Sequence, residues 1–92
     1  MNYRIVYGKR IDRKRLLKIP KNERRRVFSM IEEKLCTRPE IFGKPLRNPL
    51  FRYWSLRIGE YRVIYWIEND IVHIELVGQR TTIYSEAERW LA

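Results

Sequence analysis

Residues 52–77, RYWSLRIGEYRVIYWIENDIVHIELV, decide the fold. Three segments in this stretch alternate apolar and polar side chains and are rich in β-branched and aromatic residues, which is typical of strands. The three segments are 52–58, 61–67 and 71–77. Gly59 marks the first turn and Glu68-Asn69-Asp70 the second, because these residue types tolerate positive φ. Strands this close in sequence pair antiparallel, since a parallel crossover needs about a dozen residues or more.

The flanking sequence predicts one further strand and three helices. The strand is expected at residues 3–7, and helices are expected at 9–18, at 23 to about 37, and from a cap at Ser85 to Leu91. The second of these helices carries apolar residues at spacings of three and four: Val27, Met30, Ile31 and Leu35. Residues 38–51, with three prolines, are expected to form a loop that ends this helix.

These elements predict an α+β fold with the order β-α-α-β-β-β-α. Its sheet is expected to be small and antiparallel, with the two N-terminal helices packed on one face and a short C-terminal helix. The other face of the sheet would then be available to a ligand. The 92 residues suffice for one domain, residues 1–92, with one core.

The charge of the chain is strongly positive and unevenly distributed. The formal net charge is +9, and 14 of the 20 basic residues are arginine. Residues 1–57 hold 17 basic and 5 acidic residues, whereas residues 58–92 hold 3 basic and 6 acidic ones. Arginine binds phosphate in a planar, bidentate manner, and a concentrated positive field attracts polyanions. The charge favours a nucleic acid as ligand, and the alternatives are a solvated surface or an acidic protein partner.

The residue types that hold metals or cofactors are scarce. Cys36 is the single cysteine and His73 the single histidine, so paired-cysteine zinc sites are excluded and both residues are expected to be structural. Neither a glycine-rich phosphate loop nor paired catalytic carboxylates occur, and we expect no metal and no cofactor.

The first residues lack the pattern of a signal peptide, and no apolar run is long enough for a membrane span. We therefore expect a cytoplasmic protein with no membrane partner.

Two arginines and a tyrosine are candidates for chemistry. Alternation along 61–67 places Arg62 on one face with Ile64 and Trp66. An arginine there is costly unless it is paired, faces a ligand, or extends its head into water. Arg80 and Tyr84 follow the last strand, where a surface charge and a packed aromatic are the simpler interpretations.

Cationic side chains could cleave RNA with the ribose 2′-hydroxyl as an internal nucleophile. The protein must align this hydroxyl with the phosphate, neutralise the developing charge and move protons.

The chain resembles the RelE/ParE superfamily of toxins, and its RelE branch in particular. The resemblance covers nearly the whole chain and rests on four runs: Lys44-Pro45-Leu46, Tyr53-Trp54-Ser55-Leu56-Arg57, Gly59-Glu60-Tyr61-Arg62-Val63-Ile64-Tyr65, and Gly78-Gln79-Arg80 with Tyr84-Ser85-Glu86. It implies the toxin of a toxin–antitoxin pair that enters the ribosome and cleaves mRNA, leaving 2′,3′-cyclic phosphate and 5′-hydroxyl ends. The implied partners are a cognate acidic antitoxin, the ribosome and mRNA, and operator DNA only through the antitoxin complex.

The same resemblance assigns roles to individual residues. Arg62 matches an arginine that contacts the scissile phosphate, and Arg80 one that stabilises the transition state or protonates the leaving group. Tyr84 matches a tyrosine that stacks on or orients the substrate, and Lys44 lies near the position of a catalytic base. The expected RNA contacts are Arg47, Arg52, Arg57 and Tyr61.

The chain departs from the pattern of this family in two places. Tyr53 and Ser55 stand where a lysine pair is expected, and Gln79 stands where many relatives have histidine. The general base stays open among Lys44, Tyr84 and Glu60, in falling order, or catalysis proceeds by arginine charge alone. A ParE-like inhibitor of DNA gyrase and a non-catalytic nucleic-acid-binding module are the alternative functions.

Overall fold

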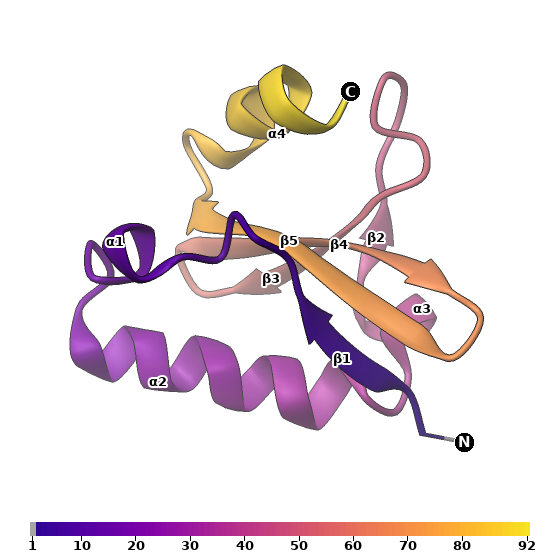
Figure 1. Ribbon diagram of the computed structural model, residues 1–92, viewed down its shortest axis with the longest axis horizontal. Helices are drawn as coiled ribbons and strands as arrows, with labels where there is room; N and C mark the ends of the chain where they lie inside the picture. The colour runs from indigo at the N-terminus through magenta and orange to yellow at the C-terminus, as the bar shows by residue number, and fades with distance from the viewer. Residues whose placement is uncertain (1) are drawn as a thin grey trace.

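The computed structural model describes residues 2–92 and contains a five-stranded sheet between helices (Figure 1). Its elements follow the chain as β1 Arg4–Tyr7, α1 Arg13–Leu16, α2 Lys21–Met30, the π-helical turn η1 Ile31–Leu35, α3 Pro39–Phe42, β2 Lys44–Pro45, β3 Trp54–Ile58, β4 Tyr61–Glu68, β5 Ile71–Gln79 and α4 Ile83–Leu91. The strand order across the sheet is β1-β5-β4-β3-β2. The predicted α+β class and the three strands of residues 52–77 are confirmed.

The sheet is mixed, although we expected it to be antiparallel throughout. The pairs β2–β3, β3–β4 and β4–β5 are antiparallel, whereas β1 lies parallel to β5 with Arg4 opposite Ile71. Parallel pairing is possible because the helices and hairpins between β1 and β5 provide the long connection that it requires.

One face of the sheet packs against α2 and η1 and forms the larger core. Three members of the predicted apolar stripe, Val27, Ile31 and Leu35, are fully buried there. They face β-sheet residues that are equally buried, including Val63 and Tyr65. The periodic pattern therefore identified the buried side of this helix correctly.

The first helix is shorter than predicted. Helical structure is confined to Arg13–Leu16, and Asp12 caps it by accepting a 2.8 Å hydrogen bond from the backbone N–H of Arg15. Arg10, Lys14 and Lys18 are four residues apart, so a helix over 9–18 would stack like charges on one side. This repulsion disfavours the longer helix, and Asp12 as the cap sets its first residue at Arg13.

The predicted loop at 38–51 contains α3 and the edge strand β2. Pro39 occupies the first turn of α3, where its missing N–H costs little. The Tyr65 hydroxyl donates a 2.6 Å hydrogen bond to the Pro39 carbonyl oxygen and ties α3 to the sheet. Burial raises the pKa of Tyr65, and the Glu40 charge raises it further, so the phenol remains protonated.

The second face of the sheet is partly covered, which corrects the expectation that it would be free. Helix α4 lies over this face (Figure 1), where Ile83 and Ala87 pack against Ile64 and Leu76. The N-cap is Thr82 rather than the expected Ser85, so the helix begins three residues earlier than predicted, and the Ser85 hydroxyl donates to the Thr82 carbonyl.

Gly78 permits the close approach of α4 to β5. A Cβ atom at this position would lie 2.9 Å from Cδ1 of Ile83 and 3.6 Å from Oε1 of Glu86. The small residue thus sets how near α4 comes to the strands that carry the candidate site.

Candidate active site

Two arginines lie side by side on the sheet face that α4 partly covers. Arg57 of β3 is directly opposite Arg62 of β4, and opposed residues of an antiparallel pair point to the same face. Arg57 is exposed, and Arg62 is half-buried with Nη1 donating to the carbonyls of Gly59 and Tyr61, each at 2.9 Å. No carboxylate of the described residues lies within 4 Å of either guanidinium. Like charges in this position are destabilising, and an anion bound between them would relieve the repulsion.

A second row of residues runs beside the arginine pair. Lys44 of β2 is opposite Ser55 of β3, and Ser55 lies two residues before Arg57 on the same face. The Ser55 hydroxyl is 2.9 Å from the hydroxyl of Tyr84 on α4. Ser55 is 7% exposed, the single buried polar or charged residue in the described part of the chain. Its burial is compensated by this hydrogen bond, which fixes the Tyr84 hydroxyl over the sheet.

Arg80 approaches the same end of the sheet from β5. Its Nε donates to Oε1 of Glu60 at 3.0 Å, and its backbone N–H donates to the Glu60 carbonyl at 2.9 Å. Arg62 binds the carbonyl of Gly59, the neighbouring turn residue, which has a φ of 58°. Both arginines are therefore anchored on the β3–β4 turn. The Arg80 side chain is 54% exposed and remains accessible to a ligand.

Tyr61 lies on the opposite face from these residues. It is 7% exposed and belongs to the core beneath α2. The Glu23 carboxylate, followed by burial, raises the pKa of Tyr61, so its phenol stays protonated. The ring of Tyr61 therefore cannot join the site without unfolding part of the core.

Arg52 and Arg47 lie outside the central group. The Arg52 guanidinium stacks 4.9 Å from the centroid of Trp66, whose other partner is the ring of His73 at 4.1 Å. Arg47 is exposed in the segment between β2 and β3. Both remain positioned for peripheral contacts rather than for chemistry.

The cations of the described residues are mostly free of carboxylate partners. Arg15 with Glu86 and Arg80 with Glu60 are the two Lys or Arg ion pairs within 4 Å among residues 2–92. A surface with so many unpaired cations favours binding of a polyanion.

Sequence reasoning missed the role of Ser55. Strand alternation alone puts Ser55 on the face of Arg57, but its partner Tyr84 is 29 residues away, on a helix whose packing the sequence does not specify.

In the described part of the chain, no three His, Cys, Asp or Glu side chains lie together as metal ligands would. Likewise, no helix among residues 2–92 is both long and apolar enough to cross a bilayer.

The chain is similar to RelE toxins in sequence and in fold. No protein-family model matches it. Toxin RelE of Mycobacterium tuberculosis is 42% identical over 43 residues, which are 47% of this chain and 44% of that toxin's length. The toxin–antitoxin complex RelBE2 of the same organism contains a chain that is 29% identical, with a TM-score of 0.75, covering 87% of this chain and 100% of the other. The RelE–RelB complex of Pyrococcus horikoshii contains a chain that is 27% identical, with a TM-score of 0.59, covering 87% of this chain and 97% of the other. The predicted resemblance to RelE toxins is confirmed.

Proposed function

We propose that this RelE-like chain is the toxin of a toxin–antitoxin pair and cleaves mRNA on the ribosome. The observation that carries the proposal is the unpaired Arg57–Arg62 pair beside the Ser55–Tyr84 hydrogen bond. The similarity to M. tuberculosis Toxin RelE supports the same function, although that match spans less than half of the toxin.

In the proposed reaction, the ribose 2′-oxygen attacks the adjacent phosphorus and the bond from phosphorus to the 5′-oxygen breaks. The products are a 2′,3′-cyclic phosphate and a 5′-hydroxyl end. Arg57 and Arg62 would bind the non-bridging oxygens, whose negative charge grows in the transition state. Arg80, which is anchored but exposed, would stabilise the leaving oxygen or assist its protonation. Tyr84 would stack on or orient the nucleotide.

A base must accept the proton of the 2′-hydroxyl. Lys44 is the first candidate, because it is exposed and opposite Ser55, on the face of the arginine pair. Glu60 is already engaged by Arg80, and the Tyr84 hydroxyl is engaged by Ser55. This ranking keeps the order Lys44, Tyr84, Glu60.

The proposed partners follow from the charge. An acidic antitoxin would cover the cationic face, and complementary charge would speed this association. Operator DNA would be contacted through the toxin–antitoxin complex.

Primer extension on a reporter mRNA, after brief induction of the chain in cells, tests the proposal. We expect new 5′ ends within translated codons, and we expect them to vanish with Arg80→Ala. Arg89→Ala is the matched control, since Arg89 is exposed on α4 with no ion pair among the described residues. Growth arrest with intact mRNA would contradict the proposal and point to a gyrase inhibitor. Absence of arrest would leave a nucleic-acid-binding module.

A further inference from the structure

A cationic groove lies between α1 and α4, and its lining includes none of the arginines of the candidate active site. Two hollows of about 300 and 330 Å³ adjoin here and share Arg15 and Lys18 in their walls. The larger is also lined by Arg10, Lys14 and Trp90. We call this surface the α1–α4 groove. Each hollow is of the size that accommodates a small ligand or one nucleotide.

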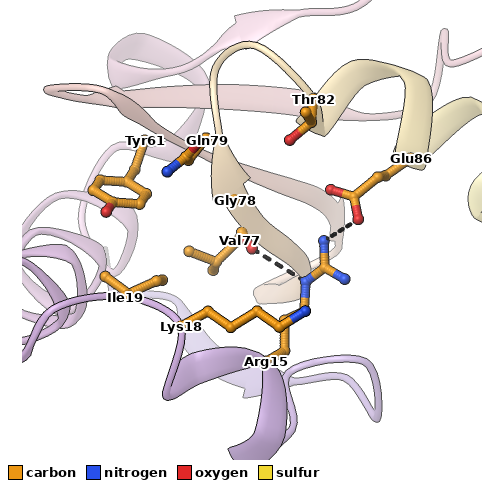
Figure 2. A pocket seen from close by; sticks show the side chains of 9 residues that line it. All are labelled: Arg15, Lys18, Ile19, Tyr61, Val77, Gly78, Gln79, Thr82 and Glu86. Atoms are coloured by element: carbon orange, nitrogen blue, oxygen red, sulfur yellow. Dashed lines mark hydrogen bonds and ion pairs between the residues drawn. The ribbon is translucent and has the colours of Figure 1, made fainter.

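Arg15 forms the rigid wall of the groove. Figure 2 shows Arg15 reaching from α1 to Glu86 of α4, with an ion pair of 2.6 Å and a hydrogen bond of 3.4 Å from Nε to the Val77 carbonyl. This contact neutralises Glu86. The other acidic residue of the groove, Asp12, is engaged as the cap of α1. Both carboxylates are thus occupied within the protein.

The remaining cations of the groove are free to bind a ligand. Arg10, Lys14 and Lys18 make no ion pair within 4 Å among the described residues. The indole of Trp90 is 37% exposed, with the guanidinium carbons of Arg15 and Arg10 at 5.2 and 6.0 Å from its ring centroid. A cationic groove with an aromatic platform is the arrangement by which proteins bind single-stranded nucleic acids.

We infer that the α1–α4 groove binds a segment of single-stranded RNA, separate from the residues that cleave it. Phosphates contact Arg10, Lys14 and Lys18, and a base stacks at Trp90. The inference rests on the proposed function for the identity of the polymer. Lysine is depleted at protein interfaces, and this groove has two lysines, so an acidic peptide fits less well.

The neighbouring hollow suits a second base. Ile19, Tyr61 and Val77 supply its apolar surface (Figure 2). The polar side chains of Gln79 and Thr82 and the charged ones of Arg15, Lys18 and Glu86 also line it, so the hollow offers a base both a surface for its ring and groups for hydrogen bonds.

The test measures binding, so it does not depend on catalysis. A fluorescent 2′-O-methyl RNA of about ten nucleotides, which lacks the nucleophile, is titrated with the full chain between about 50 and 200 mM salt. The logarithm of the binding constant decreases as the logarithm of the salt concentration rises. We expect this negative slope to become shallower by about 1.4 in the Lys14→Ala/Lys18→Ala variant, because each lost phosphate contact on a single strand contributes about 0.7. Arg25→Ala/Arg38→Ala is the control. It removes the same charge from two exposed arginines that line neither hollow.

Trp90 is tested separately because stacking is not ionic. We expect Trp90→Ala to weaken binding by about 5- to 150-fold with an unchanged salt slope, and Trp90→Phe to retain most of the affinity. Thermal unfolding of each variant checks that it is folded.

Three results would overturn the inference. The first is no RNA binding by the parent chain, and the second is no greater loss in the groove variants than in the control. The third is a groove whose variants lose affinity for a polyglutamate peptide but not for RNA, which would make it a protein-docking surface. A failure of the proposed function shows in a different measurement: primer extension would detect mRNA cleavage that persists in the Arg62→Ala and Arg80→Ala variants.

Discussion

Replacing Arg57 by glutamine should stabilise the fold and impair the reaction at once. Arg57 and Arg62 are directly opposed across β3 and β4, where Cβ atoms are about 4.5–5.5 Å apart. If this Cβ separation, about 5 Å, is taken as the distance between the two charges, the guanidinium groups repel by about 0.8 kcal/mol in water. Screening at about 0.1 M salt reduces this to roughly 0.5 kcal/mol. For a domain of this size we expect Arg57→Gln to raise Tm by about 2–4 °C.

The assay is thermal unfolding followed by circular dichroism at low salt and at about 1 M salt, where the Debye length falls to about 3 Å. The gain in Tm should shrink at the higher salt, while mRNA cleavage falls by about 10²-fold because a preorganised donor is lost. Arg52→Gln serves as the control, since Arg52 stacks on Trp66 and its loss should lower stability slightly. A lower Tm for Arg57→Gln, or a salt-independent gain, would refute the idea that the two arginines repel in the free protein.

Three further predictions follow from the site and the core. Arg62→Ala and Arg80→Ala should each reduce cleavage by about 10²- to 10³-fold, as primer extension would measure, while circular dichroism shows an intact fold. If the Ser55 hydroxyl positions Tyr84, then Ser55→Ala and Tyr84→Phe should lower cleavage by similar factors, and the double variant should be no worse than either; additive losses would mean independent roles. Tyr65→Phe should lower the free energy of unfolding by about 1–3 kcal/mol in urea titrations, because the Pro39 carbonyl loses its buried donor, and an unchanged midpoint would contradict this.

The parts of the fold that were predicted correctly depend on local rules. The hairpins of residues 52–77 follow from alternation and from turn residues such as Gly59 and Asn69, both of which have positive φ. The stripe on α2 likewise follows from the helical period. In each case the deciding residues lie within a few positions of one another.

The parts that were missed depend on contacts between distant segments. Nothing in residues 3–7 specifies that β1 pairs in parallel with β5, at the far end of the chain. Nor does the sequence of α4 specify that Ile83 packs over Gly78, the contact that sets where Tyr84 lies. Pairing and packing of this kind depend on the total burial that the whole chain achieves, which local patterns do not report.

The candidate site residues divide in the same way. Strand alternation separates Tyr61 from Arg62, whereas the β3–β4 register, which the sequence does not give, places Arg57 on the face of Arg62. Tyr61 was expected as an RNA contact only because of the resemblance to the RelE/ParE superfamily. Adjacent residues of a strand point in opposite directions, so neighbours in the sequence are the least suitable pair for one site.

The two faces of the sheet therefore serve different purposes. The face beneath α2 is closed, and residues such as Val63, Tyr65 and Ile74 are fully buried there. This core supplies enough stability for the other face to keep Arg57 and Arg62 opposed without a carboxylate partner among the described residues. Filling that position with an acid would relieve the repulsion but would also neutralise the positive charge that the proposed reaction requires. A fold that tolerates an unfavourable charge pair at its surface is expected where that pair has a ligand to bind.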